Sequence, residues 1–272
     1  MRWTPGGESS DIEDRRGSSG FGGGAPIGIG GAIILLILSL VFGKNFFAIF
    51  QGSPTTSTST ADARPVEQTP AESKEVQFVS FVLDDAQTTW EKTLGNRYHH
   101  AKLVLFRDAI PSSCGFAQAA SGPFYCPVDE KVYLDLGFFD EMRDRFAATG
   151  DFAQAYVITH ELGHHVQKLL GIEKRGRSDS VAIELQADCF AGIWAHSTSQ
   201  RNILESGDIE EGLNAASAVG DDRLQKAAGR SVNPDTFTHG SSKQRASWFR
   251  RGYDSGRIED CDTFRAGSQI RQ

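Results

Sequence analysis

The chain has 272 residues, a formal net charge of −7 and 39% hydrophobic residues, which suffices for one core of ordinary size and a tail. Its 35 acidic side chains outnumber its 28 lysines and arginines, so composition gives no general electrostatic case for nucleic-acid binding. Gly, Ser, Thr and Pro are concentrated in the first 75 residues, which separates an N-terminal part from a globular domain.

Residues 1–26 are polar and glycine-rich, and they end in a Gly-Gly-Gly-Ala-Pro run. A segment of this composition buries too little apolar surface to offset the entropy of ordering. We therefore expect a disordered tail over 1–26.

Residues 27–50 form the most apolar segment of the chain. No charged residue occurs from Ile27 to Gly43, and apolar residues resume after Lys44 and continue to Phe50. This length is near the ~20 residues of a membrane-spanning helix. A cleaved signal peptide and a buried core helix are the alternatives, but the long polar stretch before the run, the lack of an A-x-A-like site and the absence of amphipathic pattern favour a retained single-pass anchor.

The basic residues around this segment give a weak orientation signal. Arg2, Arg15 and Arg16 precede it, whereas Lys44 and Arg64 are the nearest basic residues after it begins. The positive-inside rule then predicts attachment to a cytoplasmic membrane with a cytoplasmic N-terminus and an extracytoplasmic C-terminal part.

A linker follows over 51–74, where twelve of 24 residues are Ser, Thr or Pro. The domain is expected over 75–272. Its apolar spacing predicts a helix over 75–94 and strands over 102–106 and 131–136. Further helices are expected over 151–170, 180–200, 208–227 and 241–254, the last opening with a Ser-x-x-Gln capping box. The predicted class is α+β, dominated by helices.

The chemistry is concentrated in an H-E-x-x-H motif formed by His160, Glu161 and His164. Within a helix, the two imidazoles lie one turn apart on one face, so both can bind one Zn²⁺ at about 2.0–2.1 Å, while Glu161 flanks the open coordination position. The alternative to a metal site is a solvent-exposed helix that carries two histidines by chance.

A catalytic zinc needs a third protein ligand. The metzincin extension is absent, because Gln167 and Leu170 stand where it requires Gly and His. Glu184 and Asp188 share one face of the helix that follows. We assign Glu184 as zinc ligand and Asp188 as acceptor of a hydrogen bond from His160 or His164. The alternative is a surface pair of carboxylates.

With these motifs, the chain resembles the bacterial neutral zinc metallopeptidase family, the YpfJ-like proteins, within the broader gluzincin group. The resemblance covers most of the chain and is carried by CGFAQAASGPFYCPVDEKVYLDLGFF, VITHELGHHVQ, ELQADCFAGIW and THGSSKQRASWFRRGYDSG, with a glycine-rich N-terminus before an apolar segment. It implies a zincin-like peptidase fold in which Lys131–Leu136 is the edge strand beside the active-site cleft.

The expected mechanism uses one Zn²⁺ per chain, held by His160, His164 and Glu184, to activate a water for attack on a peptide bond of a polypeptide substrate. Glu161 is the general base. His239 is the candidate donor to the oxyanion, with Tyr253 and Arg245 as rivals and a plain loop histidine as the alternative.

The four cysteines have no C-x-x-C spacing, which disfavours a zinc knuckle. An extracytoplasmic domain permits disulfides. Cys114 and Cys126 would close a local loop, and a Cys189–Cys261 pair would tether the C-terminus near the site, although three connectivities are open.

Two function classes follow from these observations. The first is a membrane-anchored zinc peptidase. The second is a zinc-stabilised binding or scaffold module without turnover, which would have no need of Glu161. The presence of that glutamate favours the peptidase.

Overall fold

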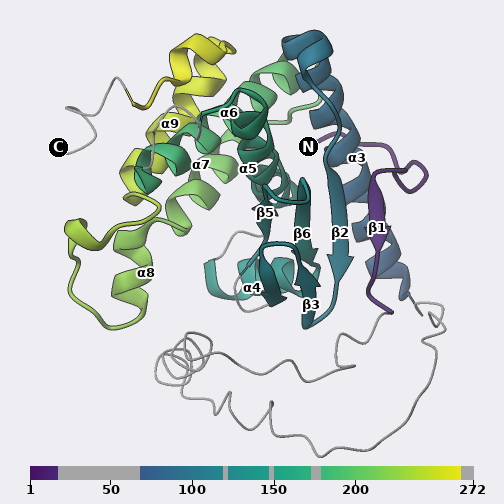
Figure 1. Cartoon of the computed structure of the whole chain (residues 1–272), viewed down its shortest axis with the longest axis horizontal. Coiled ribbons are helices and arrows are strands. Elements are labelled where there is room, and N and C mark those ends of the chain that lie inside the picture. Colours follow the sequence, from purple (N-terminus) through teal and green to yellow (C-terminus); the bar gives the residue numbers. More distant parts are fainter. Residues whose placement is uncertain (18–67, 119–121, 147–149, 173–178, 265–272) are drawn as a thin grey trace, which may run out of the picture. The chain divides into compact units, whose positions relative to one another are not determined.

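A computed structural model describes residues 1–17, 68–118, 122–146, 150–172 and 179–264 (Figure 1). Within these ranges, no helix is both long enough and apolar enough to cross a membrane. The predicted anchor over 27–50 lies outside the described residues, as do residues 18–26 of the predicted tail and residues 51–67 of the predicted linker.

Helices predominate, which confirms the expected α+β class. The sequence predicted α5 (Asp151–Leu169), α6 (Ser180–Gln200) and α9 (Ser242–Ser255) to within about a residue at each end. The expected helix over 208–227 is instead two, α7 (Asp208–Ala218) and α8 (Asp221–Ala227). The break occurs at Gly220, where a Cβ atom would lie 2.3 Å from the backbone nitrogen of Ser242 at the start of α9.

The main sheet has the strand order β1-β2-β6-β5. β1 (Ile12–Asp14), β2 (Lys102–Phe106) and β6 (Lys131–Asp135) run parallel, and β5 (Phe124–Cys126) pairs antiparallel with β6. Since β6 lies between two strands, its interpretation as the edge strand is wrong. β5 occupies that edge, because the chain turns back after β5 and pairs β6 on its free side.

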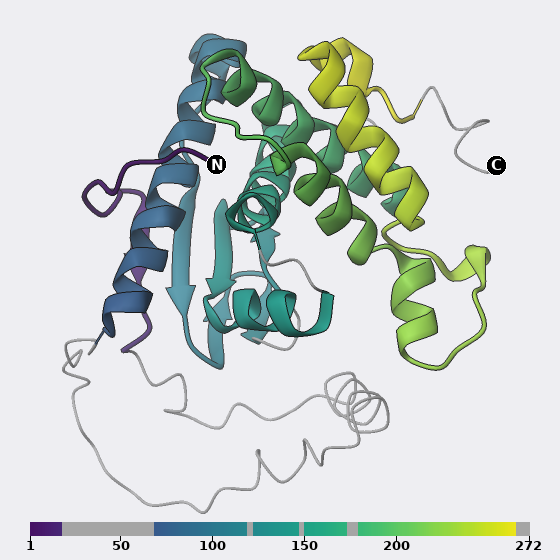
Figure 2. The same ribbon diagram turned by 180° about the vertical axis from the view of Figure 1, so that it is seen from behind.

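Both faces of the sheet are covered. Leu103, Leu105, Val132 and Leu134 pack with α3 (Pro70–Leu94), α4 (Gly137–Phe146) and α5 in the main core, on the side seen in Figure 2. The opposite face is covered by a hairpin of β3 (Ala109–Ser112) and β4 (Gly115–Gln118), which sequence periodicity did not predict. Each of these strands has only four residues, too few for a clear alternation.

The first long helix starts earlier than predicted, inside the expected linker. Thr69 and Glu72 form a capping box and Pro70 occupies the first turn, so α3 begins at Pro70 rather than at residue 75. Thr69 and Pro70 belong to the Ser/Thr/Pro-rich stretch that indicates a linker, but they form the N-terminal cap and first turn of this helix.

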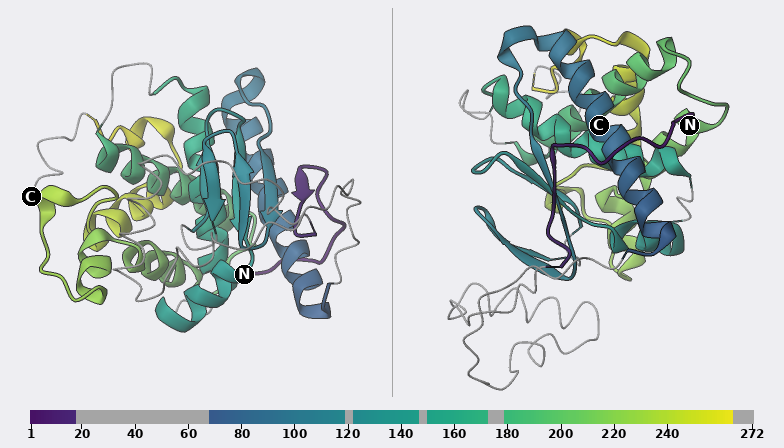
Figure 3. Two further views of the ribbon diagram at one scale, coloured as in Figure 1. Left: turned by 60° about the horizontal axis from the view of Figure 1, so that its bottom comes forward. Right: turned by 90° about the vertical axis from the view of Figure 1, so that its right-hand side faces the viewer.

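The N-terminal segment, residues 1–17, belongs to the same compact unit as the rest of the described chain. In Figures 1 and 3 it lies beside α3 and carries β1. The Trp3 ring packs 5.2 Å from the Phe78 ring of α3. The prediction of a disordered tail is therefore wrong for residues 1–17, because partners far along the chain supply the packing that composition alone cannot.

Candidate metal centre

Three side chains with metal-binding atoms meet between α5 and α6. His160 and His164 lie one turn apart on α5, and Glu184 approaches from α6. The Nε2 atom of His160 is 3.2 Å from Glu184 Oε2, and Nε2 of His164 is 3.5 Å from Glu184 Oε1. One potential ligand atom from each residue lies within 4.8 Å of the others.

These spacings fit a tetrahedral metal. Ligand atoms at 2.0–2.1 Å from zinc in a tetrahedron lie about 3.3 Å from one another. Two imidazole nitrogens and one carboxylate also match the donor set of catalytic zinc sites. The residues therefore fit the metal that the motif predicts.

The two helices approach closely enough for this convergence because Gly163 faces α6. A Cβ at Gly163 would lie 3.0 Å from the backbone oxygen of Ala187, tighter than ordinary van der Waals contact. Glycine between the motif glutamate and His164 thus lets the two helix backbones pack at the depth where Glu184 reaches the histidines.

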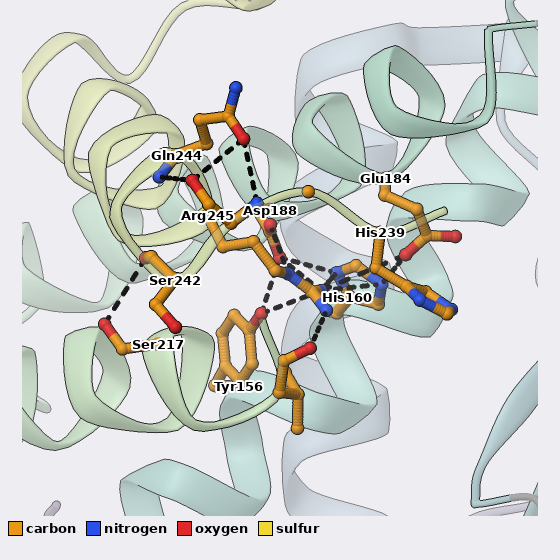
Figure 4. A network of polar contacts seen from close by, with 12 residues as sticks. Tyr156, His160, Glu184, Asp188, Ser217, His239, Ser242, Gln244 and Arg245 are labelled. Carbon is orange, nitrogen blue, oxygen red and sulfur yellow. Dashed lines mark hydrogen bonds and ion pairs between the residues drawn. The ribbon is translucent and has the colours of Figure 1, made fainter. Parts of the chain in front are cut away.

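Asp188 orients His160 within a buried polar network (Figure 4). Nδ1 of His160 lies 2.9 Å from Asp188 Oδ1, and Tyr156 Oη donates to the same oxygen at 2.5 Å. Arg245 of α9 donates from Nε to Asp188 Oδ2 at 2.8 Å and from a terminal nitrogen to Oδ1 at 2.9 Å. With Nδ1 committed to Asp188, Nε2 of His160 faces Glu184.

Arg245 reaches Asp188 because α6 and α9 pack backbone to backbone. A Cβ at Gly252 would lie 1.9 Å from the Cys189 oxygen, and one at Gly192 would lie 2.1 Å from the Phe249 oxygen. Any larger residue at either position would push α9 away and withdraw Arg245.

His164 has a different partner. Its Nδ1 lies 2.9 Å from Gln167 Oε1, and the Gln167 amide donates in turn to Ile183 O and to Gln186 Oε1. Gln186 donates to the Cys261 carbonyl at 2.8 Å. The far nitrogen of His164 is therefore held by an amide network that extends to the C-terminal part of the domain.

Glu161 is buried beside the histidines, and the backbone of Tyr125 in the edge strand β5 hydrogen-bonds its carboxylate. Burial raises the pKa of the Glu161 carboxyl, although the nearby His160 and His164 act in the opposite direction. A carboxylate with a raised pKa, held next to a candidate metal position, is suited to accept a proton at neutral pH.

The surrounding charges favour ionised groups at the centre. Burial alone would lower the pKa of His160, but the charge and hydrogen bonding of Asp188, together with Glu184, raise it to about 10. Burial raises the pKa of Glu184 and of Asp188. His164, His160 and Arg245 nevertheless bring the pKa of the Glu184 carboxyl below its ordinary range, and Arg245 and His160 do the same for the Asp188 carboxyl. Glu184 is thus an anion, as a carboxylate metal ligand must be, whereas His160 would have to release its Nε2 proton to bind a metal.

His239 lies in the loop before α9, and Asp221 at the start of α8 organises this loop. Asp221 Oδ2 accepts from the backbone nitrogens of Thr238, His239 and Gly240, and its Oδ1 lies 3.2 Å from His239 Nδ1. Gly240 packs against Leu185, the residue after Glu184, which brings the loop to the end of α6 that faces the centre.

The two other candidate donors to the oxyanion, Arg245 and Tyr253, have partners elsewhere. Arg245 is occupied by Asp188 and Tyr156. The Tyr253 hydroxyl lies 3.4 Å from Ser199 Oγ, and Ser199 is fifteen residues after Glu184 on α6. At 1.5 Å rise per residue this is about 22 Å from the centre. Neither side chain is free to meet an oxyanion at the metal position.

Two disulfides flank the centre. Cys114 pairs with Cys126 at a Cα–Cα distance of 5.8 Å and joins the β3–β4 hairpin to β5. Cys189 pairs with Cys261 at 5.7 Å, next to Asp188 on α6. The second bridge fixes the C-terminal turn whose Cys261 carbonyl accepts from Gln186.

Sequence reasoning missed Tyr156 and Gln167 and assigned Arg245 only as a rival oxyanion donor. Tyr156 precedes His160 by one helical turn, and Gln167 follows His164 by three residues, so helical spacing could have suggested both. The contact between Arg245 and Asp188 could not be predicted from local spacing, because Asp188 lies 57 residues earlier in the chain.

Comparison with known proteins shows related chains over almost the full length. The profile of a family described as "Putative neutral zinc metallopeptidase" matches residues 1–264. YpfJ of Escherichia coli strain K12 is 46% identical over 287 aligned positions, covering 97% of this chain and 99% of that protein. Rv2575 of Mycobacterium tuberculosis strain H37Rv is 40% identical over 201 positions, covering 67% and 68%. No solved structure matches the chain.

Proposed function

Since the chain belongs to this neutral zinc metallopeptidase family, we propose that it hydrolyses peptide bonds at the centre between α5 and α6. His160, His164 and Glu184 would hold one Zn²⁺ per chain. The observation that carries the proposal is the convergence of these three ligand atoms beside the buried carboxylate of Glu161. Bound zinc would supply Lewis-acid activation of a water and of the scissile carbonyl.

Glu161 performs the proton transfers. Its carboxylate takes the proton of the attacking water and then delivers it to the leaving amine. The Tyr125 backbone orients this carboxylate, and burial raises its pKa toward the operating range. Asp188 and Gln167 are positioning residues, because each holds the far ring nitrogen of one histidine.

His239 is our candidate for stabilising the oxyanion. Asp221 lies within hydrogen-bonding distance of its Nδ1, which would leave Nε2 to face the substrate. About half of the His239 side chain is exposed, so the ring is accessible from solvent.

An extended polypeptide is the substrate that the site suits best. In the described part of the chain, β5 is the edge strand of the main sheet beside β6, and extended peptides commonly bind along a sheet edge. The backbone of Tyr125 in this strand also contacts the catalytic carboxylate, so a peptide added along β5 would pass beside Glu161.

The test is the substitution Glu161→Gln in the full chain, with Glu210→Gln on the exposed surface of α7 as control. We expect hydrolysis of an unstructured protein to fall by at least ~10²-fold, because positioned acid–base catalysis contributes about 10²–10⁴-fold. Zinc content and thermal midpoint should match the parent, and the control should retain full activity.

Two results would overturn the proposal. One is a zinc-loaded parent that cleaves no unstructured protein, which would favour the alternative of a zinc-stabilised scaffold module. The other is a Glu161→Gln variant that cleaves as fast as the parent.

A further inference from the structure

The N-terminal segment is an integral strand of the domain sheet. Ile12, Glu13 and Asp14 of β1 lie in register with Leu103, Val104 and Leu105 of β2. The Leu103 nitrogen donates to the Asp11 oxygen at 2.8 Å, and the Arg15 nitrogen donates to the Leu105 oxygen at 2.8 Å. Residues before and after the apolar segment 27–50 therefore form one sheet.

Buried side-chain contacts strengthen this attachment. Asp11 is only 7% exposed and accepts hydrogen bonds from Gln87 of α3 at 2.8 Å and Lys102 of β2 at 2.7 Å. His100 Nδ1 lies 2.5 Å from the same carboxylate. If residues 1–17 were elsewhere, the fully buried Gln87 amide would lose its acceptor, which would destabilise the domain.

The segment is attached at its other end too. The Arg2 nitrogen donates to the Ile203 oxygen at 2.7 Å, and the α-ammonium group of Met1 lies 2.9 Å from Asp151 and 3.2 Å from Asp208. Attachment thus extends from α3 across to the first residues of α5 and α7. A segment bound at this many places shares the compartment of the domain.

This pairing conflicts with a single crossing of a membrane by residues 27–50. A single crossing would leave β1 and β2 in different compartments, and the charged Glu13–Lys131 pair, which joins β1 to β6 of the same sheet, cannot lie in hydrocarbon. A return crossing needs a second stretch of about 20 apolar residues. The apolar segment spans only 24 residues in total and includes Lys44.

We propose that residues 1–17 and 68–264 lie on the same side of the membrane, and that the protein binds the lipid bilayer from that side. The partner is thus a lipid surface that the protein binds as a monotopic protein. This replaces the single-pass orientation that the basic residues suggest, and it does not depend on the peptidase activity.

The test is a zero-length cross-link between Glu13 and Lys131 in the full chain, in native membranes opened so that a carbodiimide reaches both faces. Their carboxylate and ammonium groups lie 2.7 Å apart, with side-chain exposures of 34% and 27%. Glu130 and Lys168 provide a matched control inside the domain, at 2.7 Å and with exposures of 31% and 30%. Mass spectrometry of peptides from the membrane fraction reports both cross-links.

We expect both cross-links in membrane-bound protein, at yields within about twofold of those in a soluble variant lacking residues 27–50. Glu13→Gln should remove only the first cross-link. Leu36→Lys should reduce membrane binding at least tenfold and leave both cross-links intact. The reason is that a charge amid the apolar run is costly to transfer from water into lipid.

Two outcomes would overturn the proposal. Membrane-bound protein that forms the Glu130–Lys168 cross-link but not the Glu13–Lys131 one would place the N-terminal segment on the opposite side. A full chain found wholly in the soluble fraction would exclude lipid contact through residues 27–50.

Discussion

The metal centre and the N-terminal segment depend on the same domain but are encoded in different ways. The metal centre lies on two long helices whose apolar periodicity, caps and H-E-x-x-H spacing are all local features. The N-terminal segment has a three-residue strand and no periodicity, and its polar contacts reach residues that lie 76 to 207 positions away. Substitutions in the two regions should therefore change different properties, namely zinc affinity at the metal centre and the free energy of unfolding at the N-terminal segment.

Replacing a ligand should have the largest effect and should be confined to the metal centre. Glu184→Ala should lower zinc affinity by more than ~100-fold, whereas Asp188→Asn should lower it by about 10–100-fold, as for a partner that only orients a ligand. Competition with a metal chelator measures both. Equal losses would contradict the assignment of Glu184 as ligand.

Removing the arginine that neutralises Asp188 should cost stability throughout the domain. Arg245→Met should lower the free energy of unfolding by about 3–5 kcal/mol, because it leaves a fully buried carboxylate without its cation. Denaturant unfolding of metal-free protein measures the change. The exposed Lys243→Met on the same helix is the control and should stay within ~0.5 kcal/mol of the parent; a similar loss there would show a general effect on α9.

The N-terminal segment should show the converse pattern. Asp11→Ala should lower the free energy of unfolding by about 1–3 kcal/mol, because it leaves the buried Gln87 amide unsatisfied. Zinc affinity should stay within twofold of the parent. The exposed Glu8→Ala in the same segment should change neither property. A loss of zinc in Asp11→Ala would mean that the two regions are coupled.

The smallest expected effect is a pH dependence of the N-terminal attachment. Burial lowers the pKa of His100, but hydrogen bonds to Asp11 and Glu91 outweigh it and raise the pKa above its usual value of 6.5. The raised pKa means that the stabilising contribution is present below about pH 6.5 and is lost as pH rises through the folded-state pKa. Lys102 also donates a hydrogen bond to Asp11.

Amide hydrogen exchange of residues 9–15 should therefore show weaker protection at pH 8 than at pH 6, after correction for the intrinsic rate. A partly exposed pair of this kind contributes less than about 1 kcal/mol. His100→Gln should remove the difference between the two pH values. A pH dependence that persists in this variant would exclude His100 as its source.

The accuracy of the sequence predictions varied with the range of the interactions involved. Helices α5, α6 and α9 were predicted closely, because 3.6-residue periodicity and caps act within a few residues. The hairpin β3–β4, the edge strand β5 and β1 were not, since strands of three or four residues show little pattern of their own. β6 was located correctly but its neighbours were not, because pairing order depends on distant segments.

The sequence by itself determined the chemistry of this protein: two imidazoles one turn apart with a carboxylate between them, and a second carboxylate pair on the next long helix. Only the tertiary structure decided which partner each group has. It paired Asp188 with His160 rather than with His164, placed Arg245 on Asp188, and added residues 12–14 to the sheet edge. The physical reason is that spacing along a helix sets local geometry, whereas burial and charge pairing across 57 or 76 residues arise only when the helices pack.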